Sequence, residues 1–249
     1  MKNRRIVVGM VTITFGAVLV CSAAAKEKDN GKSGKQVVDS GSFSVLMSGV
    51  RVATETFSIQ QGAAGSTISS QFKSAQGEQV AEQSSELELT PSAELRKYEW
   101  KATAPEKVSA TVLPNDAFLV ETYSLGADNK PTAQNFLLPA STSILDDYFF
   151  IHREVLAWKY LASACKNDKG NLNCPHQRVQ FGALNPHART SMSVTIEFSG
   201  RDKVTLRGAE RELSKFVLSS EAGDWTFWLD DQLKLVRLRS ETGTEIVRD

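Results

Sequence analysis

The chain contains few cysteines and histidines, and its charges cancel. It has three cysteines and three histidines in 249 residues, and 29 basic residues balance 29 acidic ones. A nucleic-acid-binding domain would need a basic stripe or face, which this balance does not indicate. Hydrophobic residues make up 41% and charged residues 23%, so the composition is that of a globular protein and not of a disordered or collagen-like one.

The motifs of common catalytic sites are also missing from the sequence. There is no glycine-rich phosphate loop, no dinucleotide fingerprint, no calcium loop and no serine in a GxSxG context. His152 has no second histidine four positions later, as a zinc-protease helix would require. The acid pairs Asp146-Asp147 and Asp230-Asp231 are better explained by a helix N-terminus and a turn than by acid–base chemistry. The sequence therefore predicts no catalytic residue, no metal site and no cofactor.

The N-terminal region has the three parts of a secretory signal peptide. Residues 1–5 are basic, residues 6–20 are mostly apolar, and residues 23–25 (AAA) form a small-x-small cleavage site. The apolar run is shorter than the roughly 20 residues that span a bilayer. Lipoprotein processing at Cys21 is disfavoured because the bulkier Val20 precedes it. We therefore expect residues 1–25 to be removed, which leaves 26 basic and 29 acidic residues. The protein is then expected to be exported to the periplasm or the extracellular space, without a membrane span.

Two further parts follow the signal peptide. Residues 26–39 are charged, contain glycine and show no apolar periodicity, which predicts a flexible linker. Residues 40–249 show repeated period-two alternation with short turns, which is typical of antiparallel strands. Among the expected turns are residues 48–49, 114–116, 200–202, 221–224 and 230–232. One hydrophobic core is expected to serve this whole region, so we predict a single β-rich domain.

One segment changes to helical periodicity. Apolar residues recur at three- and four-residue spacing through residues 143–164, and Ser143 is suited to the N-cap position. The fold class predicted is mainly β, a curved antiparallel sheet or partly open barrel with one long inserted helix at about 143–164.

Two cysteines remain after signal removal, nine positions apart. In an oxidising compartment Cys165 and Cys174 are expected to form a disulfide that closes the polar loop between them. The alternative is a metal site that adds His176, but the sequence offers neither a convincing fourth ligand nor a CxxC pair.

Aromatic residues are concentrated in the helix and in the last hairpins. They are expected to fill the interface between sheet and helix, or to enclose a cavity for a hydrophobic or lipid-like ligand. The candidate ligand-binding residues are Tyr148, Phe149, Trp158, Phe216, Trp225, Phe227 and Trp228. The first functional hypothesis is therefore a non-catalytic binding or carrier protein of the cell envelope. The alternatives are an envelope glycan or peptide hydrolase that uses a loop histidine (His176 or His187) with a carboxylate, and a structural or assembly factor. The sequence gives no indication of the oligomeric state.

The order of these features resembles exported bacterial β-rich proteins of a domain-of-unknown-function family. The similarity lies in residues 49–55 (GVRVATE), residues 144–146 (ILD) and the closing hairpin at residues 225–236 (WTFWLDDQLKLV). It implies export and a curved antiparallel fold, and it transfers no catalytic residue. At the level of fold alone the chain is also similar to periplasmic lipoprotein carriers, which have an open half-barrel and a helical lid.

Overall fold

The computed structural model describes residues 34–74, 80–126, 130–168, 171–175 and 177–249. The predicted signal peptide lies outside these residues, as do residues 26–33 of the predicted linker and His176. The linker was predicted to extend to residue 39, but the first strand begins at Gln36 and Asp39 is buried within it.

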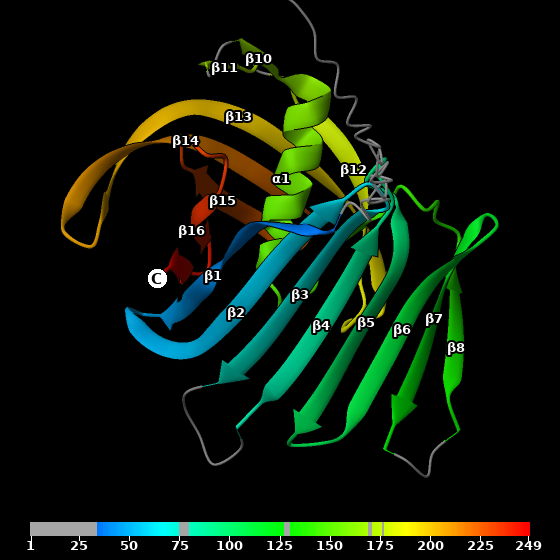
Figure 1. The fold of residues 1–249 in the computed structure, drawn as a ribbon. Coiled ribbons are helices and arrows are strands. Elements are labelled where there is room, and N and C mark those ends of the chain that lie inside the picture. The colour runs from blue at the N-terminus through cyan, green and yellow to red at the C-terminus, as the bar shows by residue number, and fades with distance from the viewer. Residues whose placement is uncertain (1–33, 75–79, 127–129, 169–170, 176) are drawn as a thin grey trace, which may run out of the picture. The chain divides into compact units, whose positions relative to one another are not determined.

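One large sheet dominates the described residues (Figure 1). Its fifteen strands have the spatial order β8-β7-β6-β5-β4-β3-β2-β1-β17-β16-β15-β14-β13-β12-β9. In chain order they are β1 (Gln36–Met47), β2 (Val50–Gly62), β3 (Gly65–Ser74), β4 (Glu82–Leu89), β5 (Leu95–Ala104), β6 (Val108–Asn115), β7 (Phe118–Leu125), β8 (Thr132–Phe136), β9 (Ser143–Ile144), β12 (Val179–Asn185), β13 (Thr190–Leu206), β14 (Ala209–Ser220), β15 (Gly223–Leu229), β16 (Leu235–Ser240) and β17 (Thr244–Arg248). All neighbouring strands are antiparallel except β9 and β12. The predicted fold class is therefore confirmed.

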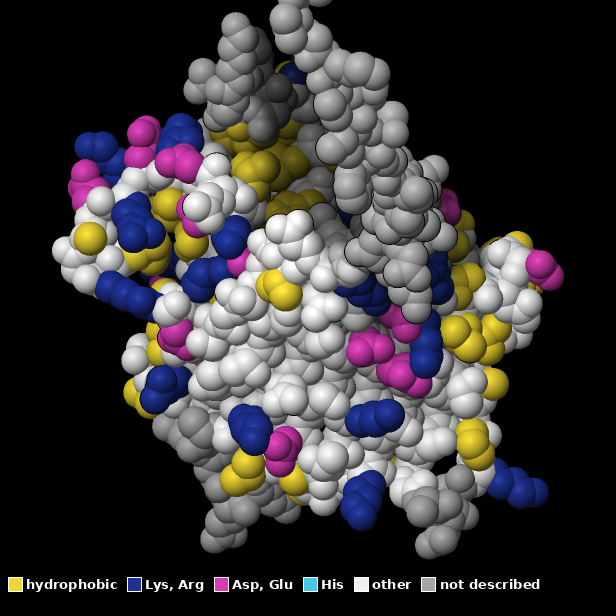
Figure 2. Space-filling model, in the orientation of Figure 1, with side chains coloured by type: hydrophobic (Ala, Val, Ile, Leu, Met, Phe, Trp, Pro, Cys, Tyr) yellow, Lys and Arg dark blue, Asp and Glu magenta, His cyan; other side chains and the backbone are white. Residues whose placement is uncertain are grey.

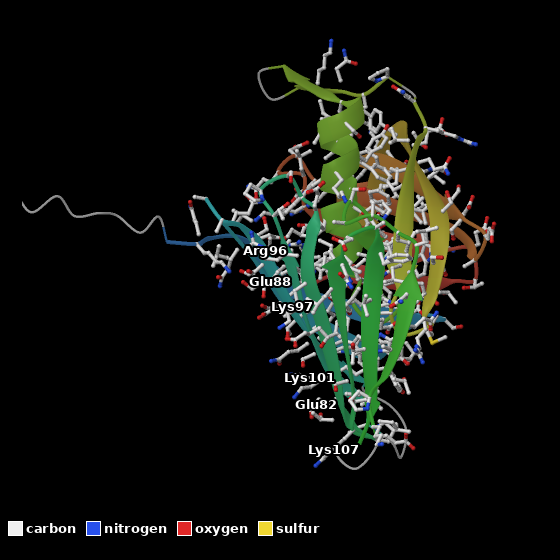
Figure 3. All side chains as sticks on the ribbon, turned by 90° about the vertical axis from the view of Figure 1, so that its right-hand side faces the viewer. Glu82, Glu88, Arg96, Lys97, Lys101 and Lys107 are labelled. Carbon is white, nitrogen blue, oxygen red and sulfur yellow. A yellow bond between two sulfur atoms is a disulfide. The ribbon has the colours of Figure 1, made fainter. Side chains whose placement is uncertain are left out.

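The two faces of the sheet follow from the period-two alternation of the strands. In β4, for example, Ser85 and Leu87 are buried against the interior while Glu86 between them is exposed. The outward face of β4 and β5 carries charged side chains that point away from the helix (Figure 3), among them Glu82, Glu88, Arg96, Lys97 and Lys101. Figure 2 shows that the adjoining outer surface is largely free of hydrophobic side chains.

The helix α1 (Ile151–Ala164) lies on the inner side of the curved sheet (Figure 1). It begins eight residues later than predicted, because Ser143 belongs to β9 and pairs with Ala183 of β12 instead of capping a helix. The first free backbone N–H groups, those of Phe150 and Ile151, donate to the carboxylate of Glu55 on β2. No helix among the described residues is long and apolar enough to cross a bilayer.

The last strand of the described residues, which the sequence did not reveal, pairs with the first. β17 pairs with β1, with Ile246 opposite Val45, and also with β16. The strands before the helix and those after it therefore form one continuous sheet. A single large cluster of buried hydrophobic residues, which includes Phe43, Tyr98 and Phe227, draws on both halves.

Two local expectations were wrong or incomplete. A turn was predicted at residues 200–202, but β13 continues through it with an irregularity between Phe198 and Gly200. The chain reverses instead at Arg207 and Gly208, which both have positive φ. The cysteine loop contains a small hairpin of its own, β10 (Lys166–Asp168) and β11 (Asn171–Asn173).

Candidate functional site

One face of α1 combines apolar residues with a lysine. Val155, Trp158, Lys159 and Ala162 are spaced three and four positions apart, which places them on the same side of a helix. This side faces the inner surface of β2, β3 and β4, where the three strands carry aliphatic side chains.

A cavity of about 140 Å³ lies between this helix face and the sheet. Its apolar walls are Ile59, Ile68 and Leu89 from the sheet and Val155, Trp158 and Ala162 from the helix. Ile59 and Ile68 are fully buried, whereas Ala162 is exposed, so the cavity opens toward the C-terminal end of α1. The indole N–H of Trp158 donates to the Leu233 carbonyl at 2.7 Å, which fixes this ring at the wall.

Lys159 is the cationic residue of this cavity. Its ammonium donates to the Ser141 carbonyl at 2.9 Å and to the Ser143 hydroxyl at 3.1 Å, which are both neutral acceptors. Among the residues that the structure describes, no carboxylate is within ion-pair distance of it. Burial lowers the pKa of Lys159, and the more distant charge of Glu94 offsets this only in part.

Acidic residues fix the first turn of α1 to the sheet. Glu55 accepts hydrogen bonds from Ser70 and from the N–H groups of Phe150 and Ile151. Burial raises the pKa of Glu55 to about 7, although each of these bonds acts in the opposite direction. Glu154, in the first turn of α1, accepts a hydrogen bond from the backbone N–H of Leu235 at 2.7 Å.

A buried ionic cluster joins the first strand, β1, and the last strand, β17, to the helix. Arg248 on β17 donates to both carboxylate oxygens of Asp39 on β1 and to Glu154 on α1. Lys234 reaches Asp39 as well, at 3.0 Å. These contacts join two neighbouring strands, β1 and β17, to the helix, although the three elements are far apart in the sequence.

The only histidine–carboxylate pair formed by the described residues involves His187 and Asp146. His187 Nδ1 lies 2.6 Å from Asp146, and its Nε2 lies 2.6 Å from Gln83 Oε1. Burial opposes ionisation of Asp146, but the hydrogen bond and charge of His187 outweigh it and lower the pKa of Asp146. The ring also stacks on Trp100 at 3.7 Å. Both ring nitrogens are occupied, so the pair positions the β12–β13 turn and offers no free nitrogen to a substrate.

Arg189 extends the same turn toward β7. Its guanidinium lies over the ring of Tyr123, and its Nε is 3.9 Å from Glu121. Both carboxylate oxygens of Glu121 are buried without a hydrogen-bond partner among the described residues. Burial raises the pKa of Glu121 to about 7, and the charge of Arg189 counteracts this only partly. Together with His187, this contact links the β12–β13 turn to the far end of the sheet.

A wide, open depression lies on the opposite face of the sheet. It has a volume of about 500 Å³ and crosses β2 to β5. The side chains that face it are short hydroxyls such as Ser58, Ser69 and Ser84, with Glu86 and Lys101 beside them. Short side chains on a flat strand surface account for this open hollow, so we place the candidate site at the apolar cavity instead.

The structure separates the seven aromatic residues predicted to bind a ligand. Trp158 lines the cavity. Tyr148 packs against Phe72 and His187, and Phe149 is fully buried near His152. The other four are not among the residues that line the cavity. Phe216 and Phe227 belong to the main hydrophobic cluster, Trp225 packs against it, and Trp228 belongs to a separate one.

The outer placement of Trp228 follows from strand alternation. Phe227 is buried on the inner face and stacks on Phe216 at 5.0 Å, so its neighbour Trp228 must point outward. There Trp228 packs in a separate small cluster with Leu213 and Val236.

The structure also places the predicted cysteine pair, the acidic residues Asp146 and Asp230, and His152. Cys165 and Cys174 form the expected disulfide, which is typical of proteins in oxidising compartments. Asp146 is a buried hydrogen-bond acceptor, and Asp230 accepts from backbone N–H groups of its turn. His152 is buried in the helix, and burial lowers its pKa to about 4.

Sequence reasoning missed Lys159, Glu55 and Glu121. Lys159 had a detectable signal, since it is a cation four residues after Val155 within an apolar stripe. Glu55 and Glu121 had a weaker one, because each falls on the inward phase of an alternating strand.

Comparisons with known proteins show a likeness of fold. No protein-family model matches the sequence, and no curated protein gives a significant match. A solved structure of a beta-barrel-like protein of domain of unknown function DUF1849 from Brucella abortus aligns with a TM-score of 0.53. The alignment covers 84% of this chain and 94% of that chain at 11% identity. A DUF1089 family protein from Pseudomonas aeruginosa aligns with a TM-score of 0.43 and 10% identity, over 75% of this chain and 89% of that chain. The fold is therefore similar to that of a β-barrel-like protein of unknown function.

Proposed function

We propose that this is an exported cell-envelope protein that binds a hydrophobic or lipid-like ligand between α1 and the sheet. The observation that carries the proposal is the cavity enclosed by aliphatic side chains of β2, β3, β4 and α1. Export is supported by the signal-peptide pattern of residues 1–25 and by the Cys165–Cys174 disulfide.

The volume of the cavity limits what it can hold. Drug-sized ligands occupy pockets of roughly 300–1,000 Å³, whereas this cavity measures about 140 Å³. An apolar cavity of ~150 Å³ is known to take up a molecule as small as benzene. The site therefore suits one apolar end of a ligand, such as a six-carbon chain or a ring, with the rest of the ligand outside the rim.

NMR titration with 1-hexanol tests the proposal directly. The chain has four tryptophans, and their indole N–H signals serve as separate reporters. Because Trp158 lines the cavity and Trp228 lies on the outer face, we expect a saturable shift of the Trp158 signal only. A Trp158→Phe variant assigns the signal.

A matched pair of variants locates the binding. Ala162→Phe places a ring at the rim and should abolish the shift, whereas Ser163→Phe adds the same ring at a neighbouring exposed position outside the cavity and should retain it. An unchanged Trp158 signal in the wild type, or equal shifts in both variants, would overturn the proposed function.

A further inference from the structure

The rim of the cavity carries a positive charge beside an otherwise apolar interior. Lys159 lies in the same helix face as Val155 and Ala162 and lines the cavity with them, and its ammonium donates to Ser141 and Ser143. The rest of the rim is polar but uncharged, with Gln61 and Ser66 contributed by β2 and β3. A ligand with an apolar end inside the cavity would place its next atoms at a rim whose one charged lining residue is Lys159.

The ammonium lacks a counter-charge among the described residues. Its two hydrogen bonds go to Ser141 and Ser143, and an ammonium has three donors. A half-buried cation with only neutral partners is costly, since buried charges are normally paired. The negative charge of Glu94 raises the pKa of Lys159, but the two residues do not form an ion pair.

We propose that the ligand of this cavity is an anionic amphiphile, with its acidic headgroup paired to Lys159 and its apolar end between α1 and β2–β4. This inference rests on the proposed function and specifies the chemical class of its ligand. A carboxylate at the rim would use the remaining donor of Lys159 and supply the missing negative charge. Hydrogen bonds to charged groups are worth more than neutral ones.

Three six-carbon probes that differ only in headgroup test the charge preference. Hexanoate, 1-hexanol and hexylammonium are titrated at pH 7.5 with the Trp158 indole signal as the reporter. We expect hexanoate to bind about tenfold more tightly than hexanol, which is the lower end of the range for a charge-assisted hydrogen bond. Hexylammonium should bind more weakly than hexanol, because like charges repel.

Variants of Lys159 assign the preference to this residue. Lys159→Gln should reduce the ratio of the hexanoate affinity to the hexanol affinity to about one, and Lys159→Arg should keep the preference for hexanoate. Lys101→Gln, on the outer face of β5, is the control and should behave as the wild type.

The possible outcomes distinguish the two proposals. If hexanol and hexanoate bind equally well to the wild type, the anionic headgroup is excluded and the apolar site stands. A preference for hexanoate that persists in Lys159→Gln also overturns the role of Lys159. If no probe shifts the Trp158 signal, the proposed function itself fails.

Discussion

At the scale of single residues, the interior contains several carboxylates in different environments. Burial acts to raise the pKa of Asp146, but the contacts with His187 and its other neighbours lower it, whereas burial raises the pKa values of Glu55 and Glu121 to about 7. Asp146 and Glu121 differ in their partners, because Asp146 has a hydrogen-bonded imidazole and Glu121 has only a guanidinium Nε at 3.9 Å. Such groups make the stability of the fold dependent on pH.

The substitution Glu121→Gln should isolate one of these contributions. The folded protein holds a proton on Glu121 up to about pH 7, while the unfolded chain releases it near the ordinary value of 4.5. Folding is therefore favoured by this group at low pH, and the benefit is lost as the pH rises from about 4.5 to about 7. We expect the wild type to lose stability relative to Glu121→Gln across this range and to run parallel to it above pH 7.

Urea unfolding of both proteins between pH 4.5 and 8.5 measures this difference. Glu55, whose pKa is raised similarly, is present in both proteins, so its contribution cancels. Glu86→Gln, at an exposed position on β4, is the matched control and should show no such trend. Parallel stability curves for wild type and Glu121→Gln over the whole range would contradict the prediction.

At the scale of secondary-structure elements, the C-terminal end of α1 is held by covalent and polar contacts. The helix ends at Ala164, and the disulfide begins at the next residue. Cys174 is buried against the main hydrophobic cluster, and the hydroxyl of Tyr160 donates to the Gln177 carbonyl. The short hairpin β10–β11 between the cysteines is thereby attached to the body of the domain at its base.

Replacing both cysteines with serine should destabilise the protein. Closing a loop of this length lowers the entropy of the unfolded chain and contributes about 2–3 kcal/mol in the chain-entropy model. For a domain of this size that corresponds to a decrease in Tm of about 5–10 °C, which calorimetry measures. Reduction of the wild type should give the same decrease. Alkylation of Cys165 and Cys174 in the native protein without reductant, or an unchanged Tm, would count against a structural disulfide.

At the scale of the whole described domain, the pairing of β1 with β17 joins the strands before and after the helix. Ile246 on β17 is fully buried between Val45 and Leu238, its partners on the two neighbouring strands. Because β17 also carries Arg248, the same strand contributes to the apolar core and to the ionic cluster around Asp39. We therefore expect residues on both sides of the helix to unfold together as one domain.

Truncation of Ile246 tests this cooperativity. Ile246→Ala should cost about 2–5 kcal/mol, as is usual for a buried isoleucine. Hydrogen exchange should accelerate in β4–β6 as well as in β14–β16, although only the latter are close to the substitution in the sheet order. Val247→Ala, on the half-exposed side of the same strand, should have a much smaller effect. Faster exchange limited to β16 and β17 would instead indicate two independent halves.

The sequence by itself determined the features that depend on near neighbours in the chain. Period-two alternation revealed most strands, short turns made them antiparallel, and the spacing of Cys165 and Cys174 predicted their bond. These signals are local because a strand face, a tight turn or a small loop is specified within about ten residues.

Only the tertiary structure decided where the helix begins, how the sheet is joined and where a cavity remains. The helix starts at Ile151 because Glu55, nearly one hundred positions earlier, accepts its first N–H groups. β17 was missed because its role depends on β1 at the other end of the domain. Helical spacing places Lys159 in the apolar stripe, but the cavity that it lines exists only because β2, β3 and β4 fold against this helix face. Contacts between distant segments leave no periodic pattern in the sequence, so local pattern analysis could not reveal them.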